Sequence, residues 1–276
     1  MMNEKEKKLR AKLAEYQQVI VGFSGGIDST VVLAEAVQVL GRENVLAVVA
    51  NSELFADAEY ERAVALAKEL GVAVEGVRLD YLSETDIANN TPNSWYAMKK
   101  IFYQALNQIA AQHKDAVVLD GMIMDDVSDF RPGLRARDEE GAISVLQQAD
   151  LYKDEVRQIA QKLNLTNWNK VASCSVSSRF PYYTELTSEK IKKVMTAEAY
   201  LRSIGYLTVR VRVYNDIADI EVPIEQLSSL VAQSTTVFQK LQAIGYQHVT
   251  LDLQGFESGR MNQTLSETEK SRALVG

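Results

Sequence analysis

The single cysteine of the chain, Cys174, lies in a polar run that suggests chemistry rather than packing. In KVASCSVSSRF (170–180), serines flank the cysteine on both sides and Arg179 follows shortly after. The thiolate is the nucleophilic form of cysteine, and a nearby guanidinium raises the ionised fraction of a thiol. Free cysteines are more often buried as small apolar side chains. The polar neighbours therefore favour a reactive thiol.

A second stretch, VGFSGGIDST (21–30), has the residues expected of an anion site. Its glycines let the backbone turn sharply, and the free N–H groups of a following helix point at a bound anion. The spacing matches neither the dinucleotide fingerprint nor the Walker A loop, which needs a Gly-Lys-Ser/Thr ending. We expect phosphate as the ligand, and a purely structural Gly-Gly turn is the alternative.

The elements that must position these residues alternate between apolar runs and helical patterns. In the first half we expect strands at 19–24, 45–51, 72–80 and 116–121, with helices at 29–40, 57–70 and 94–113 after a charged opening helix. Continuous Val, Leu and Ala runs separated by helices indicate βαβ units and a parallel sheet covered on both faces. The expected fold is a doubly wound α/β domain with ligands at the carboxyl ends of its strands.

The second half has a different order of elements. Residues 122–141 are charged and rich in helix breakers, which predicts a mobile loop. Beyond it we expect a helix at 153–163, then helix 188–204, strand 207–214, strand 218–222, helix 224–244, strand 248–253 and a loose tail after Gly259. This later α-β-β-α-β order is typical of a small α+β domain, here with a hairpin around Asn215 and Asp216. We expect one domain over 1–183 and a smaller one over 184–276.

Composition limits the classes of partner and site. Thirty basic and 37 acidic side chains give a net charge of −7, which disfavours binding to nucleic acid or to an anionic membrane. No segment resembles a signal peptide or a membrane span, so we expect a cytoplasmic protein. With one cysteine and two histidines, neither an internal disulfide nor a Cys/His zinc site is expected. Any metal should therefore have oxygen ligands.

The S-G-G-x-D-S spacing resembles the PP-loop of the ATP pyrophosphatases, which are adenine nucleotide alpha hydrolase-like enzymes that split ATP between its α and β phosphates. The resemblance implies ATP and Mg²⁺ as ligands, with Asp28 helping to bind the metal. VVANSE (48–53) is where such enzymes receive adenosine, and ADLYKDEVRQIAQKLNL (149–165) resembles a helix whose lysine approaches the phosphates. A solvated helix start is the other explanation of Lys153. The implied ATP-binding residues are Ser24, Gly25, Gly26, Asp28, Ser29, Thr30, Ser52, Gly121 and Lys153.

Longer strings over most of the chain point to one family within this superfamily. They are VVANSELF (48–55), NNTPNSWYAMKK (89–100), DGMIMDDVSDFRPGLRAR (120–137), NWNKVASCSVSSRFPY (167–182) and TLDLQGFESGRMN (250–262). They resemble the LarE sulfur transferases, which make the nickel-pincer nucleotide cofactor of lactate racemase. Some relatives carry three cysteines that hold an iron–sulfur cluster, a ligand set that one cysteine cannot build.

The resemblance implies a mechanism in which the protein is consumed. The substrate of the family is pyridinium-3,5-biscarboxylate mononucleotide. The enzyme adenylates a carboxylate, its cysteine attacks the acyl adenylate to form a thioester, and cleavage of the Cβ–S bond leaves a thiocarboxylate and a dehydroalanine. Cys174 would be the sulfur donor in a single turnover that releases AMP and pyrophosphate. A homo-hexamer and other nickel-pincer cofactor biosynthesis proteins as partners are also implied.

Arginines make up most of the implied substrate site. In LTVRVRVY (207–214), two arginines alternate with valines, so both project from one strand face and can fork onto phosphate or carboxylate oxygens. Without the family match, an exposed face with surface ion pairs would be the ordinary explanation. Trp95 would stack on the substrate ring or, alternatively, pack into the core. The implied substrate-binding residues are Trp95, Ser178, Arg179, Arg210 and Arg212.

Breaking the Cβ–S bond requires a base that removes the α proton of the cysteine. Glu198 and Glu221 are the candidates, and a carboxylate on a solvated face is the commoner explanation of either. Asp126 and Asp129 are expected to solubilise their loop rather than to bind metal. Tyr183 departs from the family pattern, because it replaces a glycine and removes an easy left-handed conformation. We therefore expect a different course for the loop after the cysteine.

Three other functions stay open. A PP-loop amide ligase or synthetase would use ammonia on another carboxylate and would need no cysteine. Transfer RNA thiolation would normally bring a basic surface and paired cysteines. A nucleotide-binding regulator would never hydrolyse ATP.

Overall fold

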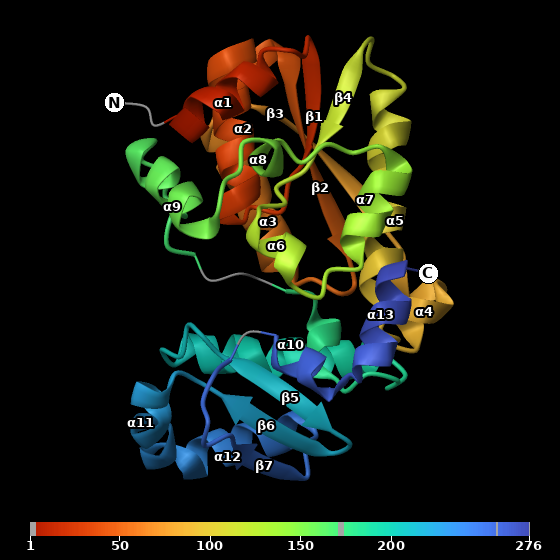
Figure 1. Ribbon diagram of the computed structural model, residues 1–276. Helices are drawn as coiled ribbons and strands as arrows, with labels where there is room; N and C mark the ends of the chain where they lie inside the picture. The colour runs from red at the N-terminus through yellow and green to blue at the C-terminus, as the bar shows by residue number, and fades with distance from the viewer. Residues whose placement is uncertain (1–3, 171–173, 258, 276) are drawn as a thin grey trace. The chain divides into compact units, whose positions relative to one another are not determined.

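The computed structural model describes residues 4–170, 174–257 and 259–275. Contacts divide the chain into two units (Figure 1). The first comprises Met1–Tyr81, Asn93–Ser173 and Arg272–Gly276, and the second comprises Leu82–Pro92 and Cys174–Ser271. This division differs from the expected boundary between residues 183 and 184, and it puts Cys174 in the second unit.

Long-range hydrogen bonds explain the difference in boundary. The side-chain amide of Asn90 donates to the carbonyls of Phe180 and Pro181, at 3.2 and 3.0 Å. The N–H of Leu186 donates to the carbonyl of Ala88 at 2.7 Å. The segments 82–92 and 174–186 therefore stabilise each other, and the order of elements along the chain carries no sign of this pairing.

A four-stranded parallel sheet forms the centre of the first unit. Its strands are β1 (Gln18–Gly22), β2 (Val45–Ser52), β3 (Ala73–Leu79) and β4 (Ala116–Leu119), in the order β3-β2-β1-β4. Its helices are α1 (Glu4–Leu13), α2 (Ile27–Leu40), α3 (Asp57–Glu69), α5 (Ser94–Ala110), α6 (Asp125–Ser128), α7 (Gly133–Glu140), α8 (Val145–Gln148) and α9 (Lys153–Lys162). In Figure 1, α1, α2 and α9 lie on one side of the strands, and α5 and α7 lie on the other.

Alternation along β1 shows how both faces of the sheet are covered. Val19 and Val21 belong to one apolar cluster, with residues of α1, α2, α3, α8 and α9. Ile20 belongs to another, with Leu106 of α5 and Ala136 of α7. Successive side chains of a strand point to opposite faces, so apolar clusters cover both faces of the sheet at β1. The predicted doubly wound α/β fold is confirmed.

Residues 122–141 are not the mobile loop that their charge predicts. They contain α6 and α7, and α7 ends at Gly141 in the left-handed conformation, with φ of 73°. Ala136 of α7 is fully buried. A short helix that buries so small an apolar side chain has almost no hydrophobic pattern, and this concealed it in the sequence.

The second unit has the expected order of helix, hairpin, helix and strand. Its elements are α4 (Thr85–Ala88), α10 (Ser188–Ser203), β5 (Arg210–Tyr214), β6 (Ile217–Glu221), α11 (Leu227–Ala232), α12 (Ser234–Ile244) and β7 (His248–Leu251). Strand β6 pairs antiparallel with β5 and parallel with β7. No helix in the described part of the chain is long and apolar enough to cross a membrane.

Two expectations for the end of the chain are wrong. The helix expected over 224–244 is interrupted at Gln233, which leaves helical geometry and donates from its amide to the hydroxyl of Tyr206 at 2.9 Å. The tail after Gly259 is not loose, because it forms a 3₁₀ turn (Arg260–Thr264) and α13 (Glu267–Val275). Ala273 of α13 is buried, which gives the polar tail an anchor.

The predicted hairpin depends on a left-handed residue. Tyr214 and Ile217 pair across the turn, and Asn215 has φ of 56°. Asn215→Val should lower the free energy of unfolding by about 1–2 kcal/mol, because a β-branched residue resists this conformation. Asn215→Gly is the matched control and should leave stability unchanged or raise it. Urea unfolding followed by circular dichroism compares the two, and equal midpoints would contradict the turn geometry.

Candidate functional site

The PP-loop motif forms the turn from β1 into α2 in the first unit. Gly25 has φ of 65°, and a Cβ there would lie 3.0 Å from the backbone of α3, so glycine is required. The hydroxyls of Ser24 and Ser29 are 3.2 Å apart, and Thr30 donates to the carbonyl of Gly26 at 2.7 Å. Hydroxyls and main-chain N–H groups thus gather at the carboxyl end of β1, an arrangement that binds phosphate.

Gly121 lets the end of β4 approach this turn. A Cβ at Gly121 would lie 2.7 Å from the nitrogen of Ser29 and 2.9 Å from its Cα. The preceding Asp120 is buried and accepts hydrogen bonds from the hydroxyls of Tyr103 and Ser144, both at 2.6 Å. These bonds fix the chain at the end of β4. Position 121 therefore requires glycine because the chain packs closely against α2 there.

Lys153 and Asp28, predicted to meet the phosphates and the metal, contact each other. The Nζ of Lys153 lies 2.9 and 2.6 Å from the carboxylate oxygens of Asp28. Burial raises the pKa of Asp28, and the attraction of Lys153 opposes that shift. The described residues include no group of three or more His, Cys, Asp or Glu suited to a metal. Asp28 fits Mg²⁺ as a single protein ligand, because Mg²⁺ commonly takes one carboxylate together with substrate phosphates.

Asp126 and Asp129 are both engaged by Arg131. The Nε of Arg131 lies 3.1 Å from Asp126 Oδ1 and 3.2 Å from Asp129 Oδ2. Asp126 also accepts a hydrogen bond from the N–H of Ile123 at 2.9 Å. These contacts tie both carboxylates to their own segment of chain, and the expectation that neither binds a metal stays a prediction.

Ser52, predicted to bind ATP, has a buried hydroxyl that makes no hydrogen bond to a described residue. The residue is 7% exposed at the carboxyl end of β2, and its Oγ is buried without a hydrogen bond to any described residue. A buried hydroxyl left unpaired costs free energy. Because β2 lies next to β1 in the sheet, Ser52 and the PP-loop share one edge. This edge fits a nucleotide at the strand ends.

Trp95 lies on the first turn of α5, in the first unit. It is partly exposed and belongs to neither apolar cluster described above. The alternative of a tryptophan packed in either of these clusters is therefore not supported. Stacking on a substrate ring remains a prediction.

Cys174 is a partly exposed free thiol at the start of the longer segment of the second unit. Residues 171–173 of the polar run quoted first lie outside the described residues. Ser175 caps a 3₁₀ turn, η3 (Val176–Arg179), by accepting a hydrogen bond from the N–H of Ser177. The carbonyls of Cys174 and Ser175 both accept from Nη1 of Arg179, at 3.3 and 3.1 Å. Arg179 therefore binds the main chain of the cysteine peptide.

A buried ion pair holds Arg179 in this position. Its Nε and Nη2 donate to the two oxygens of Glu198 at 2.8 and 3.1 Å, and both side chains are 3% exposed. Glu198 also accepts from Arg202 at 2.6 Å and from the N–H of Val211 at 3.2 Å. Burial by itself would raise the pKa of Glu198, but Arg179, Arg202 and Arg210 together hold it below its ordinary value.

A second pair joins Arg212 of β5 diagonally to Glu221 of β6, whose direct partner in the strand register is Arg210. Arg212 donates from Nε and Nη2 to Glu221 at 3.0 and 2.9 Å, and from Nη1 to the carbonyl of Ser178 at 2.6 Å. Arg210, on the same strand face, is 8% exposed. Burial lowers the pKa of Arg210 to about 10, and the nearby Arg179 adds to the effect. The strand is therefore not the exposed, surface-paired face given as the ordinary alternative.

Tyr183 adopts the left-handed conformation that its replacement of glycine was expected to prevent. Its φ is 65°, its N–H donates to the carbonyl of Asn90 at 3.0 Å, and its hydroxyl donates to Glu269 at 2.8 Å. These bonds offset the cost of about 1–2 kcal/mol for a left-handed residue other than glycine. The expectation that tyrosine would redirect the chain through loss of positive φ is wrong.

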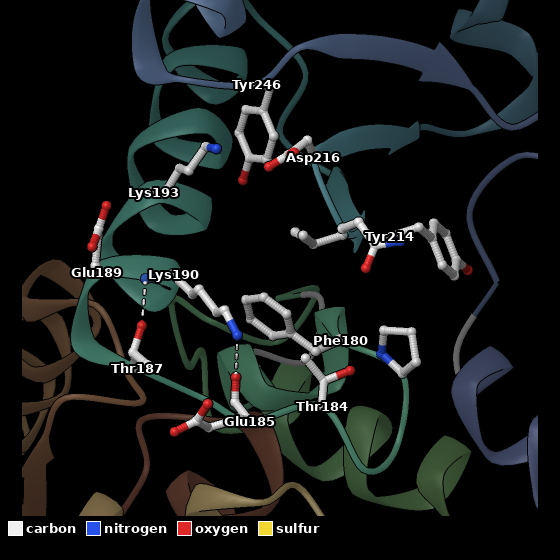
Figure 2. Close-up of a pocket in the computed structure, with 13 residues that line it drawn as sticks. Phe180, Thr184, Glu185, Thr187, Glu189, Lys190, Lys193, Tyr214, Asp216 and Tyr246 are labelled. Carbon is white, nitrogen blue, oxygen red and sulfur yellow. Dashed lines mark hydrogen bonds between the residues drawn. The ribbon is translucent and has the colours of Figure 1, made fainter.

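Figure 2 shows a cavity of about 690 Å³ in the second unit. Its lining does not include Cys174 or the predicted substrate-binding arginines. The Nζ of Lys190 donates to the carbonyl of Glu185 at 2.7 Å, and Lys193 contacts the ring of Tyr246. The lysines of this cavity are thus already engaged, and the cavity is distinct from the predicted site.

The predicted residues therefore fall into two groups, one in each unit. The ATP-binding residues and Trp95 belong to the first unit, and Cys174, Ser178, the arginines and the two glutamates belong to the second. Sequence reasoning missed Asn167 and Lys170, which both donate to the carbonyl of Gly25 in the PP-loop. The only signal was their place in the string NWNKVASCSVSSRFPY, where no role was given to them.

Comparisons with known proteins show which family the chain is similar to. The sequence profile of the NAD synthase family matches residues 1–174. A pyridinium-3,5-bisthiocarboxylic acid mononucleotide synthase of Lactiplantibacillus plantarum is 58% identical over 96% of each chain. An uncharacterized protein of Synechocystis is 38% identical over 97% of this chain and 100% of its own. A component of the glutamine-hydrolyzing GMP synthase of Archaeoglobus fulgidus is 21% identical over 65% of this chain and 62% of its own.

Because the hydroxyl of Ser52 is unpaired, its removal should affect stability and ATP binding in opposite directions. Ser52→Ala should leave the free energy of unfolding unchanged or raise it by up to about 1 kcal/mol, because no hydrogen bond is lost in the ligand-free protein. The same change should weaken ATP binding severalfold if the hydroxyl pairs with the nucleotide. Thermal unfolding and calorimetry with ATP and Mg²⁺ measure the two effects.

Ser94→Ala is the matched control for Ser52. Ser94 is 1% exposed and its Oγ is likewise buried without a hydrogen bond to a described residue. It should reproduce the effect on stability and leave ATP affinity unchanged. Equal ATP affinities for both variants would remove Ser52 from the nucleotide site.

The Arg179–Glu198 pair predicts a pH dependence of stability. The pKa of Glu198 is lower in the folded state than its ordinary value of 4.5. Its charge therefore stabilises the fold at pH values above 4.5, and this stabilisation is lost as the pH falls through the folded-state pKa. Glu198→Gln should lower the free energy of unfolding by about 3 kcal/mol at pH 7. The difference in free energy of unfolding between Glu198→Gln and the parent should disappear at acid pH.

Urea unfolding at several pH values tests the pair. The control is Glu189→Gln, because Glu189 is exposed on the same helix, α10. A constant difference between parent and Glu198→Gln at every pH would show that the charge of Glu198 contributes nothing.

Proposed function

The chain belongs to the LarE family of sulfur transferases, within the PP-loop superfamily, and on this premise we propose that it adds sulfur from Cys174 to a pyridinium dicarboxylate nucleotide. The observation that carries the proposal is a free thiol that is partly exposed in a peptide whose main chain is fixed by a buried arginine. A cysteine kept for packing would be buried.

The first half of the reaction activates the substrate. A carboxylate oxygen of the substrate attacks the α phosphorus of ATP, the bond to the bridging oxygen breaks, and pyrophosphate leaves. The hydroxyls and N–H groups of the PP-loop would hold that pyrophosphate. Mg²⁺, held by Asp28, would neutralise phosphate charge. Since Mg²⁺ competes with Lys153 for Asp28, metal binding would release the ammonium toward the phosphates.

The second half transfers sulfur. The thiolate of Cys174 attacks the acyl carbon, and AMP leaves with the bonding electron pair, which gives a thioester. A base then removes the α proton of Cys174. The Cβ–S bond breaks with its electrons going to sulfur, so the product is a thiocarboxylate and residue 174 becomes dehydroalanine. Atoms and charges balance without an added oxidant or reductant.

Arginines would bind the anionic groups of the substrate. Arg210, whose pKa burial lowers to about 10, gains most from a new anionic neighbour because its charge is poorly solvated. Arg179 and Arg212 are each fixed by a glutamate. The contacts of Glu198 and Glu221 support a positioning role for both, and proton removal by either stays a prediction.

The assembly and its partners are part of the same proposal. Family resemblance supports a homo-hexamer that works with other nickel-pincer cofactor biosynthesis proteins. Its substrate would be a small nucleotide, and a net charge of −7 argues against nucleic acid as a partner.

Intact-mass spectrometry tests the sulfur transfer. After incubation with ATP, Mg²⁺ and the dicarboxylate nucleotide, the protein should lose about 34 Da, the mass of H₂S, at position 174, as covalent transfer from the side chain requires. Cys174→Ala should still release pyrophosphate but form no thiolated product. An unchanged mass beside a thiolated product would refute the sacrificial step, and formation of an amide from ammonia by Cys174→Ala would favour an amide ligase.

A further inference from the structure

Two side chains that precede the cysteine peptide bind the PP-loop. The amide nitrogen of Asn167 lies 3.1 Å from the carbonyl oxygen of Gly25 and 2.9 Å from the hydroxyl oxygen of Thr30. The Nζ of Lys170 lies 3.4 Å from the same carbonyl and 2.8 Å from Glu59. All five residues belong to the first unit.

The hydrogen-bond inventory fixes the orientation of the Asn167 amide. The hydroxyl of Thr30 donates its one hydrogen to the carbonyl of Gly26 at 2.7 Å, so toward Asn167 it acts as an acceptor. The carbonyl of Gly25 is also an acceptor, and an amide nitrogen has two hydrogens to give. The reversed amide would place an oxygen against two acceptors. Its Oδ1 accepts no hydrogen bond from a described residue, so the loop alone dictates this orientation.

The hydrogen bonds to the carbonyl of Gly25 also fix the direction of the next N–H group, that of Gly26. In a planar trans peptide the C=O and the following N–H point in opposite directions. With the carbonyl turned to Asn167 and Lys170, the N–H of Gly26 is turned the other way, toward Ser24 Oγ at 3.3 Å. That N–H lies just before α2, where an anion would take it as a donor.

We propose that Asn167 is a positioning residue that preorganises the PP-loop for the pyrophosphate portion of ATP. It acts through Gly25 and Thr30 and does not itself need to touch the nucleotide. The inference rests on the proposed function only in taking ATP as the ligand of the loop, and it does not depend on the fate of Cys174.

Calorimetry with Mg²⁺ and either ATP or AMP, without the carboxylate substrate, tests the proposal. Asn167→Ala should weaken ATP binding about tenfold, because two hydrogen bonds that fix the loop are lost. Asn167→Asp keeps the volume but has no hydrogens to donate and adds negative charge, so it should weaken ATP binding further. AMP lacks the pyrophosphate portion and should lose less than about threefold in affinity with either variant.

Asn169→Ala is the control, because Asn169 is an exposed asparagine two positions away. It should bind both nucleotides like the parent. ATP affinity within twofold of the parent for both Asn167 variants would overturn the proposal. An equal loss for ATP and AMP, with a lowered unfolding temperature, would also overturn it by assigning Asn167 to folding. The mass assay on the parent judges sulfur transfer separately.

Discussion

The ion pair between Arg179 and Glu198 is the interaction on which the cysteine-bearing unit depends. It joins three elements, because Arg179 ends η3, Glu198 lies on α10, and the same carboxylate accepts from the N–H of Val211 on β5. Two charges buried together are costly unless their remaining hydrogen bonds are satisfied. Arg179 meets this condition by donating to main-chain carbonyls, and Glu198 meets it by accepting from Arg202. Fold and functional geometry are therefore set by one network.

In the first unit, two glycines let backbone segments pack closely at the carboxyl ends of β1 and β4. Gly25 allows a left-handed turn against α3, and Gly121 allows the end of β4 to touch the start of α2. At either position, a single added methyl group would push apart two segments of backbone that are in contact. If this turn holds pyrophosphate as proposed, the two glycines shape the site through the side chains that they lack, and Asn167 orients the loop from outside it.

Much of this was predictable where a residue's neighbours in sequence are also its neighbours in space. The strand runs at β1 and β2, the glycine turn and the Asn215 hairpin all have local patterns, and all were predicted. The pairs Arg179–Glu198 and Arg212–Glu221 span 19 and 9 residues, and nothing in the composition of either stretch names the partner. Helices α7 and α13 were missed because each buries little apolar surface. Tyr183 was misjudged because its stabilising partners, Asn90 and Glu269, come from distant parts of the chain.

The hydrogen bonds from Arg179 to the carbonyls of Cys174 and Ser175 would also affect the protein after the proposed reaction. Those oxygens belong to the backbone, so they remain when a sulfur atom leaves the side chain. If the proposed transfer takes place, a spent molecule would keep these backbone bonds to Arg179 and would stay folded. Quality-control proteases that recognise exposed core would have no reason to select it. A cell that uses such a protein would accumulate intact but exhausted copies, and its capacity for the reaction would be set by the rate of new synthesis.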